Sequence, residues 1–152
     1  MTEQFPARSS LYPRHPRVAV GAFVFKNNRV LLVKRGRPPS VGLWAIPGGN
    51  MKLGETLQEA TEREILEETG LTIKAREPVF TFDVIKKDDT GRIRYHYVIV
   101  DLIAEYISGT LQAGDDALEA RWVSPRELDG LGVSERTRQV LKKRFGFGKN
   151  TA

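Results

Sequence analysis

The chain has 152 residues, 40% of them hydrophobic and 28% charged, a size and composition that suit one globular domain. It contains no cysteine, which excludes disulfides and thiolate metal sites, and no apolar run approaches the ~20 residues that cross a bilayer. The formal net charge is +5, yet Lys and Arg are scattered and are not interleaved with aromatic residues. We therefore expect neither a nucleic-acid partner nor a membrane partner. The N-terminus lacks the apolar core of a signal peptide, which favours a cytoplasmic protein.

The N-terminal third predicts a loose arm followed by short strands. Residues 1–16 are polar, contain three prolines and indicate a flexible arm, so a single domain is expected over residues 17–146. Runs rich in Val, Phe and Leu predict strands at residues 17–25, 29–34 and 43–46. Residues 26–28 suit a hairpin turn between the first two strands. Prolines and glycines make residues 36–42 a loop, and the segment Pro47–Gly49 is interpreted in the same way.

The middle of the chain predicts one helix and a long hairpin. The helix should begin near Thr56, with Thr56 or Glu55 as its cap. It should end at Gly70 in a left-handed conformation. Residues 71–85 and 92–107 have the pattern of strands, and the polar turn between them indicates a hairpin.

The C-terminal part predicts a further strand and two helices. The strand covers residues 119–123, and Pro125 suits the first position of a short helix. Ser134 is the expected cap of a last helix over residues 135–145, and residues 147–152 are expected to be a disordered tail. Strands and helices that alternate around one sheet make an α/β sandwich.

The helix that should follow Thr56 is strongly acidic. Residues 50–70 hold six Glu against one Lys and one Arg, so this segment carries −4 within a basic chain. Glu64, Glu67 and Glu68 are three and four residues apart and project from one side of the helix. They repel one another, and they lie in the last turn, where the helix dipole disfavours anions. Oxygen-rich clusters of this kind suit hard divalent cations, so we predict a Mg²⁺ site in which Mn²⁺ can substitute.

The same segment fits the pattern G-x5-E-x7-R-E-U-x-E-E-x-G-U, in which U is a bulky aliphatic residue. Every fixed position is filled, by Gly49, Glu55, Arg63, Glu64, Ile65, Glu67, Glu68, Gly70 and Leu71. This pattern is the Nudix box, and the chain resembles the Nudix (MutT-like) hydrolases over roughly residues 17–145. The resemblance implies an α/β/α sandwich with a central mixed β-sheet. It also implies an enzyme that uses water and a divalent metal to cleave a nucleoside diphosphate linked to another moiety.

The resemblance assigns roles to the residues of the box. It implies that the carboxylates of Glu64, Glu67 and Glu68 are catalytic and bind the metal, and that the backbone carbonyl of Gly49 is a further metal ligand. It also implies that Glu55 pairs with Arg63 and holds the loop onto the helix as structural support. A helical rotation of about 100° per residue turns Arg63 away from the acidic row.

The resemblance leaves two positions open for the group that activates water. Some members use the Glu at the position of Glu64, and others use an acid in a loop outside the box. The loop acids here are Asp115, Asp116 and Glu119. Asp116 lies six residues before Trp122, where some relatives place an acid that reaches the metal, so we predict that Asp116 is catalytic and metal-binding. The alternative is that the Gly-Asp-Asp segment is an ordinary turn.

Four residues outside the box are candidate contacts to substrate. Arg35 and Arg37 could hold phosphates, and the alternative is ordinary surface charge. Trp44 and Tyr97 could stack on a base, and the alternative is packing in the core. The chain departs from many members at Lys52, which stands where they have a further Glu, so the number of metal contacts stays open.

A softer resemblance concerns the substrate. Residues 114–123 resemble the bacterial Nudix group of ADP-ribose pyrophosphatases, which makes ADP-ribose the favoured small-molecule substrate and AMP and ribose 5-phosphate the products. The alternatives are a nucleoside triphosphate pyrophosphohydrolase of the 8-oxo-dGTP type and a dinucleoside polyphosphate hydrolase. A non-catalytic nucleotide sensor is disfavoured, because every carboxylate of the box is present. Many family members are homodimers, so the resemblance also implies that this chain can form one.

Overall fold

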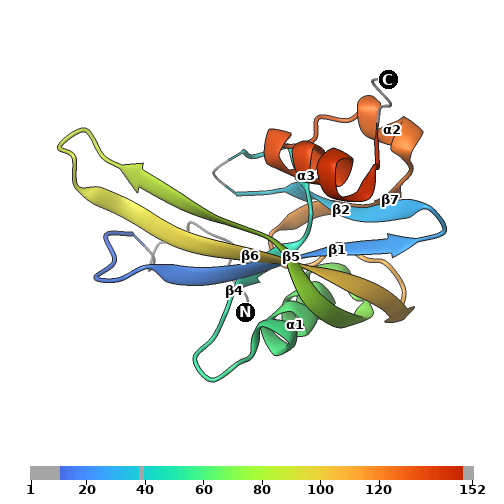
Figure 1. Cartoon of the computed structure of the whole chain (residues 1–152), viewed down its shortest axis with the longest axis horizontal. Coiled ribbons are helices and arrows are strands. Elements are labelled where there is room, and N and C mark those ends of the chain that lie inside the picture. Colours follow the sequence, from blue (N-terminus) through green and yellow to red (C-terminus); the bar gives the residue numbers. More distant parts are fainter. Residues whose placement is uncertain (1–10, 38–39, 149–152) are drawn as a thin grey trace.

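The computed structural model describes residues 11–37 and 40–148. It consists of one seven-stranded mixed sheet with helices on both faces (Figure 1). The strands are β1 (Arg17–Lys26), β2 (Arg29–Arg35), β3 (Trp44–Ala45), β4 (Gly48–Asn50), β5 (Thr72–Lys87), β6 (Ile93–Ser108) and β7 (Ala117–Val123). The helices are α1 (Leu57–Thr69), α2 (Pro125–Asp129) and α3 (Glu135–Phe145). Helix α1 covers one face of the sheet, and α2 and α3 cover the other. The predicted α/β/α sandwich with a mixed sheet is confirmed.

Strand β1 lies at the centre of the sheet and connects its two halves. It pairs in parallel with β6 and antiparallel with β2 and β4. Strands β3 and β7 pair with β2, and β5 pairs with β6 in a long hairpin. The short strand β4 leads through a loop into α1. The central pairing of β4 with β1 therefore fixes the start of this loop beside the middle of the sheet.

Side chains of the central strands alternate between two cores, because successive residues of a strand point to opposite faces. Phe23 and Leu32 belong to a buried cluster on the side of α3. Val24 and Leu31 belong to a second cluster that contains Ile65 of α1. Each helical layer thus completes one core, and α1 is held against the sheet by its apolar side.

The two ends of α1 lie where local signals predict them. The Thr56 side chain accepts a hydrogen bond from the backbone N–H of Glu59, and the Glu59 carboxylate accepts one from the backbone N–H of Thr56. This capping box makes Thr56, and not Glu55, the N-cap. Gly70 follows the helix with φ of 75° and donates its N–H to the carbonyl of Leu66, as predicted.

One strand was missed by sequence reasoning. The segment Pro47–Gly49 was predicted to be a loop, but Gly48–Asn50 forms β4 and pairs with residues 19–21 of β1. Glycine has a low intrinsic preference for strands, so the pairing is imposed by the neighbouring strand. The hairpin turn at Asn27 and Asn28 is confirmed, since both have left-handed φ values of 50° and 59°.

The predicted loose ends are partly ordered. The tail prediction is wrong at Phe147, which is 6% exposed and packs in the core on the side of α3; residues 149–152 lie outside the described residues. Tyr12, within the predicted arm, donates its N–H to the carbonyl of Arg94 and its hydroxyl to Asp88. Residues 11–16 therefore include contacts to the β5–β6 hairpin, whereas residues 1–10 lie outside the described part.

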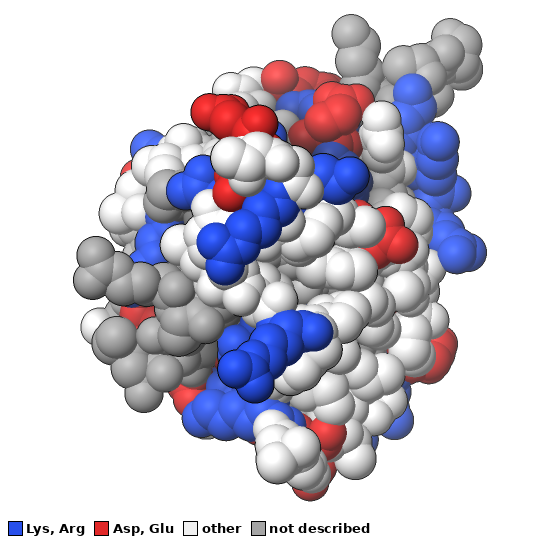
Figure 2. Space-filling model, turned by 90° about the vertical axis from the view of Figure 1, so that its left-hand side faces the viewer, with Lys and Arg blue, Asp and Glu red and all other residues white. Residues whose placement is uncertain are grey.

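The surface carries charge of both signs. On the face shown in Figure 2, Lys and Arg are separated by uncharged surface, and Asp and Glu gather mainly toward one end. No helix in residues 11–37 and 40–148 is long and apolar enough to span a membrane.

Candidate active site

The site is built where β4 runs beside α1. A Cβ atom at Gly49 would lie 2.3 Å from Oε1 of Glu64 and 2.5 Å from its carboxyl carbon. Real Cβ contacts are never so short, so any side chain at position 49 would displace the Glu64 carboxylate. Glycine thus lets the acid of α1 lie directly against the backbone of β4.

Glu64 is fully buried, with 0% exposure. Its Oε2 accepts a hydrogen bond from Nη1 of Arg63 at 2.9 Å, whereas its Oε1 is buried and has no hydrogen-bond partner in the described part of the chain. Burial raises the pKa of Glu64 to about 7, against the lowering effect of the Arg63 hydrogen bond. An unpaired carboxylate oxygen at this depth is costly for the free protein, which indicates that it serves a ligand.

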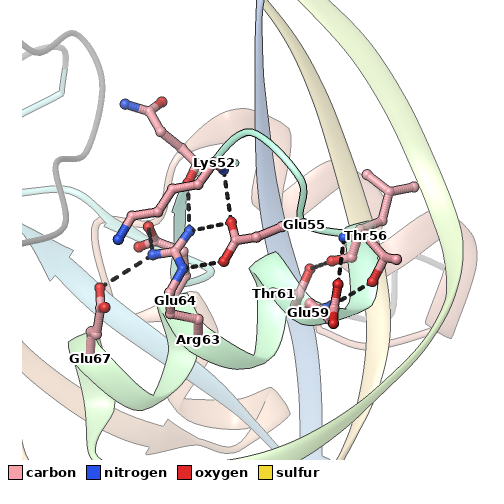
Figure 3. Close-up of polar contacts among 10 residues, drawn as sticks. Lys52, Glu55, Thr56, Glu59, Thr61, Arg63, Glu64 and Glu67 are labelled. Carbon is pink, nitrogen blue, oxygen red and sulfur yellow. Dashed lines mark hydrogen bonds and ion pairs between the residues drawn. The ribbon is translucent and has the colours of Figure 1, made fainter.

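Arg63 is the centre of the polar network in Figure 3. Its Nε and Nη2 donate to the two carboxylate oxygens of Glu55 at 2.5 and 2.8 Å, and Nη2 also donates to the carbonyl of Asn50 at 2.9 Å. The hydrogen bond to Glu55 is the main cause of the raised pKa of Arg63, and the same bond lowers the pKa of Glu55. The pair therefore ties the loop after β4 to α1, in the geometry predicted for it.

The expectation that Arg63 faces away from the acidic row is wrong. Its Nη1 lies 2.9 Å from Oε2 of Glu64 and 3.4 Å from Oε2 of Glu67. The long Arg side chain reaches along the helix, so rotation per residue alone does not determine its contacts. Arg63 consequently links the supporting Glu55 to two of the predicted metal ligands.

The other two acids of the row differ in exposure. The Glu67 side chain is 31% exposed, whereas Glu68 is 1% exposed. Burial lowers the pKa of Arg35, and the negative charge of Glu68 opposes that shift. The last turn of α1 contains no basic residue. A cation bound beside this turn would therefore relieve both the repulsion among the acids and their unfavourable interaction with the helix dipole.

The loop before β7 packs against the end of α1. Gly114 donates its N–H to the carbonyl of Glu68 at 2.8 Å. Asp116 forms an ion pair with Nε of Arg37 at 2.9 Å, and its side chain is 12% exposed. Asp115 has a left-handed φ of 48°, and its charge contributes to the raised pKa of Glu64. The structure thus brings the loop acids toward the helix, while Asp116 is paired with Arg37 and its metal-binding role stays a prediction.

A cavity of about 470 Å³ lies on the α3 side of the sheet and reaches β4. Its wall includes Gly48, Gly49 and Arg35, and, at another part, Asp101 and the first turn of α3. This volume falls in the usual range for pockets that hold small molecules. Arg35 lines this cavity, and its contact with a bound phosphate stays a prediction; Arg37 is not among the residues of the wall.

The predicted stacking residues lie in the core instead. Trp44 is 6% exposed and belongs to the cluster that contains Phe23 and Leu141. Tyr97 is 0% exposed and packs with Tyr95 and Ile99 in another buried cluster. Neither ring is accessible to a base, so the alternative of core packing replaces the stacking prediction. Aromatic residues fill cores as well as binding sites, and the sequence could not separate these two uses.

Sequence reasoning also missed Asp101. The residue is 5% exposed and lines the cavity. A signal was present, because Asp101 is the single charged residue in the strand segment Tyr97–Ala104. A lone acid in an otherwise apolar strand is seldom there for stability.

A family model described as the NUDIX domain matches residues 15–143. The chain belongs to the Nudix hydrolase family. The resemblance seen in the box is thereby confirmed, and the protein is an enzyme of the hydrolase class.

Individual relatives of this Nudix hydrolase carry different names. A protein named ADP-ribose pyrophosphatase from Methanocaldococcus jannaschii is 40% identical over 117 residues, which cover 77% of this chain and 67% of the relative. A putative 8-oxo-dGTP diphosphatase from Bacillus subtilis is 33% identical over 124 residues, covering 79% of this chain and 76% of the relative. A solved structure, the bifunctional NMN adenylyltransferase/ADP ribose pyrophosphatase of Francisella tularensis in complex with AMP and a Mn ion, is 26% identical with a TM-score of 0.62. It covers 84% of this chain and 40% of the other.

Nudix hydrolases generally use divalent metal ions, and the residues at this site fit one. The candidate ligands are all oxygens, the Oε1 atom of Glu64 has no partner in the described residues, and the absence of a side chain at Gly49 lets this carboxylate lie against the backbone of β4. Within residues 11–37 and 40–148, no group of three or more His, Cys, Asp or Glu side chains is assembled as a metal cage. Mg²⁺ keeps several waters and needs only a few carboxylates, so an open row of acids suits it.

Proposed function

We propose that this Nudix hydrolase is a Mg²⁺-dependent pyrophosphohydrolase that cleaves the diphosphate of a nucleoside diphosphate linked to another moiety. The observation that carries the proposal is the buried Glu64 carboxylate, which packs against Gly49 and has one oxygen without a hydrogen bond from any residue that the structure describes. A stable helix needs no such group. A divalent cation held between the acids of α1 and a diphosphate in the adjoining cavity would provide the missing partner for this buried oxygen of Glu64.

The metal would be held by the carbonyl of Gly49 and the carboxylates of Glu64, Glu67 and Glu68. When bound, such an ion neutralises phosphate oxygens and acidifies a coordinated water. Arg63 orients two of these carboxylates, since it contacts both Glu64 and Glu67. Glu55 fixes Arg63 in turn through two hydrogen bonds. Supporting contacts of this kind set ligand geometry and often change activity strongly when they are removed.

The cavity next to β4 is the proposed place of the substrate. Gly48 and Gly49 form part of its wall, so a diphosphate there would lie beside the metal ligands. Arg35 lines the same cavity and supplies a positive charge for phosphate oxygens. Asp116 and Glu64 remain the two candidates for the group that accepts a proton from the attacking water.

ADP-ribose is the favoured substrate, and the relative that supports it is 40% identical to this chain. The alternative is an oxidised nucleoside triphosphate, which the name of a 33% identical relative suggests. The two reactions leave different products. ADP-ribose would give AMP and ribose 5-phosphate, and 8-oxo-dGTP would give the monophosphate and pyrophosphate.

Incubation of the purified protein with ADP-ribose and Mg²⁺ is expected to yield AMP and ribose 5-phosphate. Removal of metal with EDTA should abolish the reaction, and added Mg²⁺ or Mn²⁺ should restore it, because the diphosphate is inert without charge neutralisation. The measurement is product identification by chromatography, with 8-oxo-dGTP and a diadenosine polyphosphate as parallel substrates. Hydrolysis that is indifferent to EDTA would contradict the metal mechanism. A higher kcat/KM for 8-oxo-dGTP than for ADP-ribose would favour the alternative substrate.

A further inference from the structure

Asp101 of β6 is a buried acid that the metal site does not use. It is 5% exposed and forms part of the cavity wall. Within residues 11–37 and 40–148, no hydrogen bond or ion pair reaches its carboxylate. Buried carboxylates are ordinarily hydrogen-bonded or paired with a cation. A carboxylate without either, which faces a cavity, indicates a ligand that completes its contacts.

The neighbouring strand makes room for this carboxylate. Asp101 pairs with Gly21 of β1 in the parallel register. A Cβ atom at Gly21 would lie 2.6 Å from Oδ1 of Asp101 and 3.1 Å from Ile46. A side chain at position 21 would therefore push the acid out of its place. Glycine is unfavourable inside a strand, so its presence here is explained by the space that Asp101 occupies.

The rest of the cavity around Asp101 is largely apolar. Phe82, Val84 and Ile99 contribute side chains from β5 and β6, and the first turn of α3 lies opposite. Arg136 of that turn places its guanidinium 3.8 Å from the centre of the Phe82 ring and does not form an ion pair with Asp101 in the described structure. Burial raises the pKa of Asp101 to about 7, and the charge of Arg136 opposes this shift. The first turn of α3 adds the polar side chains of Ser134, Glu135 and Thr137 to the wall. Largely apolar walls with a few hydrogen-bonding groups are suited to a flat heterocycle with a polar edge.

We propose that Asp101 determines base specificity by accepting a hydrogen bond from the exocyclic amino group of the nucleobase. This inference rests on the proposed function, since it assumes that the cavity holds a nucleotide. An ionised carboxylate has acceptor oxygens and no donor. A 6-amino group, as in adenine, satisfies one of these oxygens, whereas a 6-oxo group in the same place presents lone pairs to them. Sites that hydrogen-bond a substrate N–H reject analogues that lack it.

The test compares the binding of AMP and IMP, which differ by the exchange of the 6-amino group for a 6-oxo group. Titration calorimetry at pH 8 with Mg²⁺ is expected to show that AMP binds about 10- to 100-fold more tightly than IMP. The variant Asp101→Leu replaces the carboxylate with an apolar side chain of similar shape. It should bring the ratio of the two affinities to about one by weakening the binding of AMP. Asp101→Asn should also bring it near one, but by strengthening IMP, because its amide can donate to the oxo group.

Asp83→Asn is the matched control, since Asp83 is an exposed acid on the adjacent strand β5; its AMP/IMP ratio should equal that of the unmodified protein. A ratio of one in the unmodified protein, or a ratio that survives in Asp101→Leu, would overturn the inference. If Asp101→Leu does not fold, the nearly isosteric Asp101→Asn provides the test, and an unchanged AMP/IMP ratio in that variant would overturn the inference. If the protein hydrolyses ADP-ribose but binds AMP and IMP equally, the role of Asp101 is contradicted and the proposed function stands. If the protein binds AMP more tightly than IMP but hydrolyses no diphosphate, the proposed function is contradicted and the nucleotide-binding role of the cavity stands.

Discussion

Glu67→Gln is expected to lower kcat by about 10²- to 10⁴-fold, because it removes a charged ligand from a metal whose contribution is several kcal/mol. The fold should be unaffected. The Glu67 side chain is 31% exposed, and it forms a long ion pair with Arg63 at 3.4 Å. Loss of this weak pair is balanced by relief of repulsion from Glu64, so the free energy of unfolding should change by less than about 0.5 kcal/mol. Steady-state kinetics and thermal unfolding measure the two effects.

Glu62→Gln is the control for this variant. It makes the same change of charge on the same helix, and Glu62 accepts a hydrogen bond from the N–H of Ala75, which the Gln oxygen can retain. Activity close to that of the unmodified protein is expected. Full Mg²⁺-dependent activity in Glu67→Gln would contradict the assignment of Glu67 as a metal ligand. Equal losses of kcat in both variants would show that the effect comes from the change of charge in general.

Gly49→Ala should damage both the fold and the chemistry. The new Cβ would lie 2.3 Å from Oε1 of Glu64, so either the buried carboxylate or β4 must move. Overpacking of this kind costs about 1–3 kcal/mol of stability. Displacement of a catalytic group by about 1 Å costs on the order of 100-fold in rate. Denaturant unfolding and kcat/KM for the same protein preparations give both values.

A double variant separates the clash from other effects of the alanine. In Gly49→Ala combined with Glu64→Ala, the colliding carboxylate is absent, so the stability cost of Gly49→Ala should largely disappear while activity stays low. Gly132→Ala is the glycine control, because the nearest atom to its Cβ is 3.6 Å away. Additive stability losses in the double variant would contradict the assigned contact between Gly49 and Glu64.

The elements with local signals were predictable from the sequence. Thr56 and Glu59 cap α1 through side chains three residues apart, and Gly70 supplies the left-handed conformation at its end. The pairing of Glu55 with Arg63 was predicted from the resemblance of the box to its family. These features depend on residues close in sequence, so a pattern is enough to locate them.

Features that depend on distant partners were not predictable. Strand β4 exists because β1 pairs with it, although its glycines indicate a loop. Phe147 is buried because the core on the α3 side has room for it. The burial of Trp44 and Tyr97 was similarly decided by packing between elements. Spacing within one helix likewise could not show that Arg63 reaches back to Glu64 and Glu67.

The cavity is the clearest case of information that only the fold supplies. Its wall combines β1, β4, β6 and the first turn of α3, which are far apart along the chain. Asp101 and Gly21 become neighbours through the parallel register of β1 and β6. A lone Asp in an apolar strand and a Gly in the centre of another were visible separately, but their juxtaposition was not.

The most direct test of the metal site is a crystal structure of the protein with Mn²⁺ and a nonhydrolysable analogue of ADP-ribose, with the ion located by anomalous scattering. We expect the ion beside the last turns of α1, with the Gly49 carbonyl and oxygens of Glu64, Glu67 and Glu68 within roughly 2.5 Å, and the diphosphate of the analogue on its other side. An ion bound elsewhere, or acids of α1 that point into bulk solvent beside a bound analogue, would contradict the account.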